Sequence, residues 1–326
     1  MSLNVYFPSL PMPNTIEELR PLVPPEVRLY AAPGDEQPVD TDIIVGGTLS
    51  DEHLVRSPHV RAVIVPFAGI PFPTQALLRQ YPDVTLHNVH FNAISTAEMA
   101  FALLLAAAKH VAELDHRIRQ GNWTWNDDTH PTDTFPGKTA VILGYGAIGK
   151  RLAPMCQALG MQVIGVRRHE PDVPERDGVA LYSAAHLAEL LPRADVLVSL
   201  LPHTRETEGL LGAKELALLP SNCILVNVGR GPVIDEEALY TVLAERRIRS
   251  AGIDAWYQYP KDDEERRHTY PSRFPFHELD NIVMTPHRAG WLQSFEKLRV
   301  AALAELLNAA NAGQPIPNLV DKELGY

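Results

Sequence analysis

The segment Thr139-Ala-Val-Ile-Leu143, followed directly by Gly144-Tyr-Gly-Ala-Ile-Gly149, decides the fold of this 326-residue chain. The apolar run predicts a buried strand, and Lys150-Arg-Leu-Ala after the glycines predicts a helix. Glycines allow a tight turn and let backbone N–H groups approach a pyrophosphate, whose charge the helix N-terminus stabilises. This order of elements therefore predicts a dinucleotide site made by Gly144, Tyr145, Gly146, Ala147, Ile148 and Gly149.

The same pattern of strand and helix repeats across residues 138–285. Strand-like runs occupy residues 139–143, 162–166, 196–201, 223–228, 250–254 and 281–285. Their alternation with helix-compatible segments predicts an α/β fold with a parallel sheet covered on both faces. A charged insert at 260–280 interrupts it, and the i,i+4 pairs Asp262 with Arg266 and Asp263 with Arg267 predict a short solvated helix there.

Residues 1–90 predict a second, smaller α/β layer. Short β-branched runs at 42–46, 62–65 and 84–87 are bounded by proline and glycine and separated by helix-like stretches. The C-terminal residues 292–310 are helical by their leucine and alanine spacing. Because this helix lies beyond the last strand of the larger sheet, we expect it to pack back onto the first domain.

A long apolar helix should connect the two regions. Ser95-Thr-Ala-Glu98 has the spacing of a capping box, and the helix is expected to continue to about Arg119. Its apolar density is too high for one solvated face, so both sides should be packed. Either a subunit interface or the core of a monomer would satisfy that requirement.

Composition narrows the class of protein. Hydrophobic residues make up 45% and charged residues 21%, as in globular proteins, and the net charge of −11 argues against a nucleic-acid or membrane surface. The longest apolar run, 99–108, is too short to cross a bilayer. The start of the chain has no export signal, and two distant cysteines fit a reducing compartment, so we expect a cytoplasmic protein. No metal site is expected, since His87 with His90 and His110 with His116 lack ligand-spaced carboxylates or thiols.

The end of the second strand predicts the cofactor. NAD binders place a carboxylate there to accept hydrogen bonds from the ribose, whereas Arg suits the additional phosphate of NADP. Here the strand ends in Arg167-Arg168-His169. Two guanidiniums favour NADP(H), with NAD(H) as the alternative if both side chains simply face water.

Four further segments carry a family resemblance. They are Leu201-Pro-His-Thr-Arg-Glu-Thr207, Leu225-Val-Asn-Val-Gly-Arg-Gly231, Ala251-Gly-Ile-Asp254 and Thr285-Pro-His-Arg-Ala-Gly290. Together with the glycine turn, and in this order, they resemble the D-isomer-specific 2-hydroxyacid dehydrogenase family over residues 62–290.

The resemblance implies two Rossmann-like parallel-sheet domains and a homodimer. The substrate-binding domain would comprise both chain ends, residues 1–98 and 291–326, and the dinucleotide-binding domain residues 99–290. It also implies Arg230 as the substrate clamp and His287 as the acid–base residue. Further cofactor contacts would come from Leu201, Pro202, Thr207, Val228, Gly229, Asp254 and Ala289.

Elementary chemistry supports the roles of Arg230 and His287. A 2-oxo acid carries a carboxylate beside its ketone, and a guanidinium can hold the carboxylate with two parallel hydrogen bonds and polarise the carbonyl. Reduction also needs a proton at oxygen, and a histidine changes its charge near neutral pH. His287 follows the strand at 281–285, where ligands bind in this architecture.

One position departs from the family pattern. Family members usually carry a Glu five residues after the residue equivalent to Asp254, paired with the catalytic histidine, and this chain has Tyr259 there. Gln258, Tyr259 or an acid within 262–265 would have to replace it, Gln being a partner found in formate-oxidising relatives; otherwise activity is lost. Without an anionic partner the pKa of His287 should lie near 6.5 or below, and reduction should decline above about pH 6.5.

On the substrate side, Val65-Pro-Phe-Ala-Gly69 resembles the family loop whose N–H groups hold the substrate carboxylate. Phe67, Ala68 and Gly69 are therefore candidate substrate contacts, although Phe67 could equally be a packing residue. Trp123, Trp125 and Trp291 are candidates for covering the site or for the dimer contact.

Together these features predict an oxidoreductase that reduces a small 2-oxo acid, such as glyoxylate, hydroxypyruvate or a longer homologue, to the D-2-hydroxy acid with NADPH preferred. Two alternatives remain open. One is a non-catalytic NAD(P)-sensing protein of the same fold, suggested by the vacant carboxylate position. The other is a dehydrogenase of a non-keto hydride donor.

Overall fold

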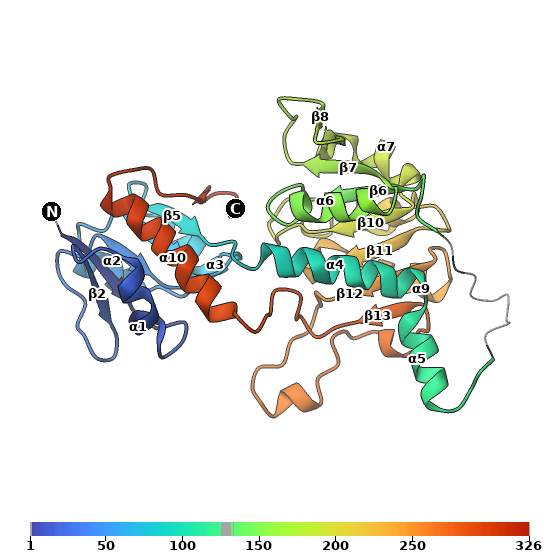
Figure 1. The fold of residues 1–326 in the computed structure, drawn as a ribbon, viewed down its shortest axis with the longest axis horizontal. Helices are drawn as coiled ribbons and strands as arrows, with labels where there is room; N and C mark the ends of the chain where they lie inside the picture. Colours follow the sequence, from blue (N-terminus) through green and yellow to red (C-terminus); the bar gives the residue numbers. More distant parts are fainter. Residues whose placement is uncertain (1, 125–131, 133, 326) are drawn as a thin grey trace. The chain divides into compact units, whose positions relative to one another are not determined.

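The structure is a computed structural model that describes residues 2–124, 132 and 134–325. The chain forms two compact units (Figure 1). One comprises Met1–Asn92 with Leu292–Tyr326, and the other Ala93–Trp291. Each unit contains one sheet dominated by parallel strands, which confirms the predicted α/β class.

The first unit is built on a six-stranded sheet of order β14-β5-β4-β3-β1-β2, in which only β14 runs antiparallel to its neighbour. Its strands are β1 (Leu3–Phe7), β2 (Val27–Ala31), β3 (Ile43–Val45), β4 (Ala62–Val65), β5 (Thr85–Asn88) and β14 (Leu319–Val320). Its helices are α1 (Thr15–Leu19), η1 (Arg20–Leu22), α2 (Asp51–Arg56), α3 (Phe72–Leu78) and α10 (Phe295–Asn311). The three strands expected before residue 90 are confirmed as β3, β4 and β5.

The C-terminal helix α10 packs against the first sheet, as expected. Val300, Leu303 and Leu307 are buried in one cluster with Val5 and Phe7 of β1. The residues expected to lie beyond the larger sheet thus complete the core of the unit formed by the N-terminal strands.

The second unit holds an eight-stranded sheet of order β13-β12-β11-β10-β6-β7-β9-β8, parallel except for β8. Its strands are β6 (Thr139–Leu143), β7 (Gln162–Arg167), β8 (Glu175–Arg176), β9 (Val179–Ser183), β10 (Val196–Ser199), β11 (Ile224–Asn227), β12 (Ser250–Ile253) and β13 (Ile282–Met284). All six strands expected in this region are confirmed.

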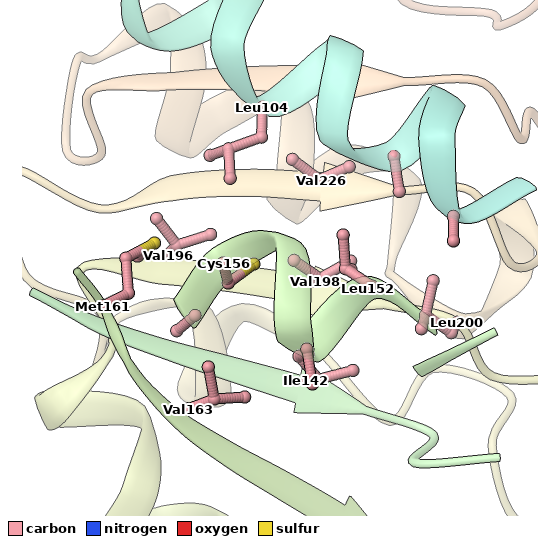
Figure 2. Close-up of a cluster of buried hydrophobic side chains, with 14 of the residues drawn as sticks. Leu104, Ile142, Leu152, Cys156, Met161, Val163, Val196, Val198, Leu200 and Val226 are labelled. Carbon is pink, nitrogen blue, oxygen red and sulfur yellow. The ribbon is translucent and has the colours of Figure 1, made fainter. Parts of the chain in front are cut away.

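Helices cover this sheet on both sides. They are α4 (Ala93–Ala108), α5 (Val111–Arg119), α6 (Gly149–Ala158), η2 (Ala184–His186), α7 (Leu187–Leu190), η3 (Leu191–Arg193), α8 (Ala213–Leu216), η4 (Gly231–Val233), α9 (Glu236–Ala244), η5 (Glu265–Arg267) and η6 (Phe276–Glu278). Figure 2 shows one of the two buried layers, where Leu104 of α4 and Leu152 and Cys156 of α6 meet Val226 of β11 and Ile142 of β6. The second layer lies on the opposite face and contains Leu239 of α9.

The strand order reverses at β6. The chain proceeds outward from β6 through β7 and β9, then returns to β10 on the other side of β6 and continues outward to β13. Ligands of open α/β sheets bind at the carboxyl ends of the strands where such a reversal occurs. The glycine turn that follows β6 lies at this point of the sheet.

The prediction of a single helix from residue 95 to about residue 119 is wrong in two respects. Helix α4 already begins at Ala93, and the Ser95 hydroxyl donates to the carbonyl of Ala289 at 3.0 Å instead of capping the helix. The helix also ends at Ala108, because His110 adopts a left-handed conformation with φ of 52° before α5 begins. Neither glycine nor proline marks this break in the sequence.

Helix α4 buries one side against β11, β12 and α6. Ile94, Glu98 and Ala102 on another side are exposed within the part of the chain that the structure describes. Of the described helices, none alone has the length and apolarity to cross a membrane; α4 and α5 pass that test only as a pair bent by 64°.

The insert at 260–280 contains only the short 3-10 helices η5 and η6. The expected i,i+4 ion pairs are replaced by a contact of Arg266 with Asp263, at i,i+3 and 3.4 Å. A tighter 3-10 turn brings residues three apart onto the same side, which explains the change of partner.

Candidate active site

The glycine turn after β6 requires glycine for steric reasons at two positions. Gly144 has φ of +95°, and a Cβ there would lie 3.3 Å from the carbonyl carbon of Leu200. A Cβ on Gly149 would approach the carbonyl oxygen of Gly144 to 2.7 Å. The first turn of α6 is thereby drawn tightly against the end of β6.

The same turn fits a pyrophosphate. Within the described residues, the N–H groups of Gly146, Ala147 and Ile148 have no hydrogen-bond acceptor, and they lie at the N-terminus of α6. A Cβ placed on Gly146 would meet no atom within 4 Å, so the space beside the backbone is open. Free N–H groups at a helix N-terminus are the elements that bind phosphate groups in dinucleotide sites.

Tyr145 contributes differently from its neighbours. Its ring is buried and covers Gly165 of β7, where a Cβ would lie 2.6 Å from Cγ of the ring. Its N–H donates to the carbonyl of Val166 at 3.0 Å. The tyrosine side chain therefore packs the turn onto β7.

The structure brings several predicted cofactor residues together at the ends of β10 and β11. A Cβ on Gly229 would lie 2.6 Å from the carbonyl oxygen of Leu201, so these two backbones are in close contact. Val228 beside them is buried. Thr207 orders the intervening loop, since its hydroxyl donates to the carbonyl of Pro202 at 2.6 Å and accepts from the N–H of Thr204 at 2.8 Å.

The two arginines at the end of β7 differ in their surroundings. Arg168 forms an ion pair with Glu206. Arg167 is exposed, and among the described residues it forms no ion pair. Arg167 is therefore the better placed of the two to meet a phosphate from solution.

Arg230 follows β11 and is supported by buried backbone contacts. Asn227 accepts from the N–H of Gly229 at 3.1 Å and donates to the carbonyl of Arg230 at 3.2 Å. One guanidinium nitrogen, Nη1, donates to the carbonyl of Gly229 at 2.7 Å. A Cβ on Gly231 would lie 2.1 Å from the carbonyl oxygen of Trp256, so the Arg230 loop packs directly against the chain that follows β12.

His287 lies in the loop after β13 and has a left-handed backbone with φ of 54°. Asp254, only 2% exposed, fastens this loop. Its Oδ1 accepts from the hydroxyl of Thr285 at 2.6 Å and the N–H of Arg288 at 2.8 Å, and its Oδ2 from the N–H of Ala289 at 2.9 Å. Asp254, a predicted cofactor contact, thus uses both carboxylate oxygens to hold the segment that carries His287.

Tyr259 is the partner of the His287 ring. Its Oη lies 2.9 Å from Nδ1 of His287 and accepts a hydrogen bond from the N–H of Trp256 at 2.9 Å. Among the described residues, no hydrogen bond joins Gln258 to the ring, and the carboxylates of Asp262 and Glu265 accept from N–H groups of their own insert. The aromatic residue at the vacant carboxylate position is therefore the group that contacts the histidine.

The electrostatic surroundings confirm the expected direction of the His287 pKa. Partial burial of the ring lowers the pKa below its ordinary value of 6.5, the positive charge of Arg230 lowers it further, and Asp254 opposes the change. Arg230 likewise acts on Tyr259, whose pKa is nevertheless raised by burial. The guanidinium of Arg230 therefore lies close enough to both rings to influence their ionisation.

The predicted substrate loop belongs to the first unit. Asn88 donates to the carbonyl of Ala68 at 2.7 Å, and the ring of Phe67 lies over Gly47. In the described chain, no acceptor binds the N–H groups of Phe67, Ala68 or Gly69. These three donors remain available to a ligand.

The tryptophans have different surroundings. The guanidinium of Arg288 lies over the ring of Trp291, 4.6 Å from the ring centroid. The side chain of Trp123 is exposed. Trp125 lies outside the described residues.

The strand reversal, the glycine turn and the unsatisfied N–H groups define a dinucleotide-binding protein. The family model described as "D-isomer specific 2-hydroxyacid dehydrogenase, NAD binding domain" matches residues 101–289. The chain belongs to the D-isomer-specific 2-hydroxyacid dehydrogenase family, and it is a dehydrogenase that uses a nicotinamide cofactor.

Similar proteins support this assignment. A glyoxylate reductase of Aeropyrum pernix is 38% identical over 237 residues, covering 71% of this chain and 67% of the relative. The glyoxylate/hydroxypyruvate reductase B of Pectobacterium atrosepticum is 30% identical over 285 residues, or 86% and 84% of the two chains.

Solved structures show the same fold. A D-isomer specific 2-hydroxyacid dehydrogenase from Xanthobacter autotrophicus Py2, in complex with NADPH and MES, aligns with a TM-score of 0.81 at 24% identity over the whole of both chains. An NADPH-dependent glyoxylate/hydroxypyruvate reductase from Sinorhizobium meliloti, in complex with NADP and sulfate, aligns with a TM-score of 0.79 at 23% identity, again over both whole chains.

Proposed function

We propose that this dehydrogenase reduces a small 2-oxo acid, such as glyoxylate, hydroxypyruvate or a longer homologue, to the D-2-hydroxy acid, with NADPH as the preferred cofactor. The observation that carries the proposal is that the Arg230 loop packs against the chain that follows β12, from which Tyr259 contacts the His287 ring, so that the charge of Arg230 acts on that ring. A cation whose charge reaches an ionisable ring matches a 2-oxo acid, which offers a carboxylate to the cation and a ketone oxygen to a proton donor.

Arg230 would bind the substrate carboxylate. Its backbone is held by the buried Asn227, and Nη1 is already bonded to Gly229, so the guanidinium is oriented before substrate arrives. A planar fork of donors matches a carboxylate and loses little freedom on binding when it is pre-oriented. Phe67, Ala68 and Gly69, whose N–H groups have no acceptor among the described residues, are also proposed as substrate contacts.

His287 would donate a proton to the carbonyl oxygen of the substrate, while the nicotinamide, when bound, supplies the hydride. A group transfers a proton most efficiently when its pKa is close to the working pH. Because the surroundings of His287 lower its pKa from the ordinary value of 6.5, the charged ring predominates only at a pH below that value. Reduction should therefore be fastest below neutral pH.

The NADPH preference is supported by the end of β7. Arg167 is exposed there, and the sequence places no carboxylate at the strand end to accept hydrogen bonds from a ribose. The proposed contacts of the dinucleotide are the free N–H groups of Gly146, Ala147 and Ile148 together with Arg167.

The proposal includes the roles of the units and a homodimer. The unit with both chain ends is proposed to bind substrate and the other to bind the dinucleotide.

Val111, Leu114 and Ile118 are exposed apolar residues on α5, spaced so that they lie along one side of the helix. Such a stripe favours contact with a second copy of the chain.

A panel of 2-oxo acids with NADPH and with NADH tests the proposal. We expect consumption of the reduced cofactor with at least one short 2-oxo acid and a higher kcat/KM for NADPH than for NADH. Cofactor binding without turnover of any panel member, or turnover only of a non-keto hydride donor in the oxidative direction, would contradict it.

A further inference from the structure

We propose that Tyr259 is a positioning residue that donates its phenol hydrogen to Nδ1 of His287 and so holds the neutral imidazole with its hydrogen on Nε2. The catalytic meaning of this inference rests on the proposed function. The tautomer itself is a property of the resting protein and can be measured without any substrate.

The hydrogen-bond pattern favours one direction of donation. The backbone N–H of Trp256 can only donate, so at 2.9 Å it occupies Tyr259 Oη as an acceptor. Nδ1 of His287, also at 2.9 Å, is the other group that Oη meets among the described residues. Because the phenol oxygen already accepts from the N–H of Trp256, its single O–H hydrogen is directed at Nδ1.

The phenol keeps its hydrogen at neutral pH. Tyr259 as a whole is 47% exposed, but partial desolvation of its phenol raises the pKa above its ordinary value of 10.0, and the opposing effects of the Trp256 N–H and of Arg230 do not reverse that direction. A neutral phenol with one acceptor bond and one donor bond has both polar functions satisfied.

The distance between the two rings is set by buried contacts. Trp256 is buried, and its indole N–H donates to the carbonyl of Thr285 at 2.8 Å, two residues before His287. The same residue supplies the N–H that holds Tyr259 Oη. Trp256 thus connects both partners, and the rings meet edge to face with centroids 5.3 Å apart.

A hydrogen bond at one imidazole nitrogen decides which nitrogen carries the hydrogen. When Nδ1 accepts from Tyr259, the neutral ring carries its hydrogen on Nε2 and can donate a hydrogen bond from there to a carbonyl oxygen. Proton transfer to that oxygen still requires the imidazolium, in which Nδ1 also carries a hydrogen and the phenol oxygen accepts from it. A carboxylate in the place of the phenol would accept from Nδ1 and reverse the tautomer.

The other charged groups near the ring, Arg230 and Asp254, do not determine which nitrogen carries the hydrogen. Arg230 is a cation and only disfavours the charged imidazole. Asp254 acts on the ring from a distance, because its oxygens are bonded to Thr285, Arg288 and Ala289. Tyr259 is the group with a hydrogen bond to the ring among the described residues.

The test is ¹⁵N NMR of the full-length protein labelled at histidine, above the pKa of His287, with the His287→Gln variant to assign the signals. We expect a pyridine-type shift at Nδ1 and a pyrrole-type shift at Nε2. Tyr259→Phe should abolish this preference, and Tyr259→Glu should reverse it. Tyr270→Phe is the matched control, since Tyr270 is exposed and stacks on His277 instead.

The same variants have a kinetic signature. A neighbouring anion raises the pKa of a histidine, so in Tyr259→Glu the decline of the reduction rate with pH should shift to higher pH by about one unit or more. At an alkaline pH the rate of this variant should then be about tenfold higher than without the shift. A wild-type ring with its hydrogen on Nδ1, or an unchanged tautomer in Tyr259→Phe, overturns the inference. If the wild type reduces no 2-oxo acid, the proposed function fails, whereas the NMR result still decides the tautomer.

Discussion

The carboxylate of Asp254 accepts a hydrogen bond from the N–H of Ala289 at 2.9 Å, and with its bonds to Thr285 and Arg288 it encloses the loop that carries His287. His287 itself has a left-handed backbone, which costs an ordinary residue about 1–2 kcal/mol. The buried carboxylate offsets this strain, and strained residues held in this way are common where a side chain must point at a ligand.

Replacing Asp254 by Asn should therefore destabilise the protein and reduce its activity together. The amide would place an N–H₂ group against either the Ala289 N–H or the pair of donors at Oδ1, leaving a buried donor without an acceptor. Such a loss costs about 1–3 kcal/mol. Urea unfolding should show the decrease, and steady-state assays should show a lower kcat. Unchanged stability and kcat would mean that the three bonds do not hold the loop.

The rate of 2-oxo acid reduction should decrease with rising pH. Burial and the charge of Arg230 lower the pKa of His287. As the pH rises, the imidazolium that donates the proton therefore deprotonates before the pH reaches the ordinary pKa of 6.5. At alkaline pH the rate should fall about tenfold per pH unit if this proton limits turnover. A rate that is constant between about pH 6 and 8.5 would identify another proton donor.

Arg167 should govern the choice between the two nicotinamide cofactors. Arg167→Gln removes a charge-assisted contact, worth about 1.5–3 kcal/mol, from the additional phosphate of NADPH and should raise KM for NADPH by about tenfold or more. KM for NADH should hardly change. Arg168→Gln is the matched control, because Arg168 is paired with Glu206 and should have a smaller effect. A larger effect at Arg168 would assign the phosphate to that residue instead.

The apolar stripe on α5 should determine the oligomeric state. Leu114→Lys places a charge in the middle of the exposed residues Val111, Leu114 and Ile118 and should convert a dimer into monomers in sedimentation velocity. Lys109→Gln alters the short segment between α4 and α5 without touching the stripe and serves as the comparison. A wild type that is monomeric at all concentrations would remove this part of the proposal.

Six of the eight strands of the larger sheet were predictable because local signals agreed with the fold, whereas β8 and β9 were not expected. The strand that became β6 is apolar throughout and ends at a glycine that requires a positive φ. β1 lies inside the smaller sheet and was missed, although Leu3–Phe7 is rich in β-favouring residues and is followed by a proline. The sequence signal was present there and could have been used.

Other features depend on tertiary contacts that no local pattern records. The break at His110 has no helix-breaking residue, so residues 95–119 look continuous in the sequence. Tyr259 and His287 are 28 residues apart, and their contact depends on Trp256 bonding to both segments. The motif spacing indicated that the carboxylate was missing, but only the folded loops identify the phenol as the group that contacts the ring.

The measurement that tests the central claim most directly is the kcat/KM of a 2-oxo acid for the wild type and for Arg230→Gln, with NADPH affinity measured on both. The proposal that Arg230 holds the substrate carboxylate while His287 supplies the proton predicts that the wild type turns over a short 2-oxo acid. In the variant kcat/KM should fall by about 100-fold or more, or about 3 kcal/mol, with little change in NADPH affinity. If the variant keeps the wild-type kcat/KM, Arg230 does not hold the substrate and the proposed reaction is contradicted.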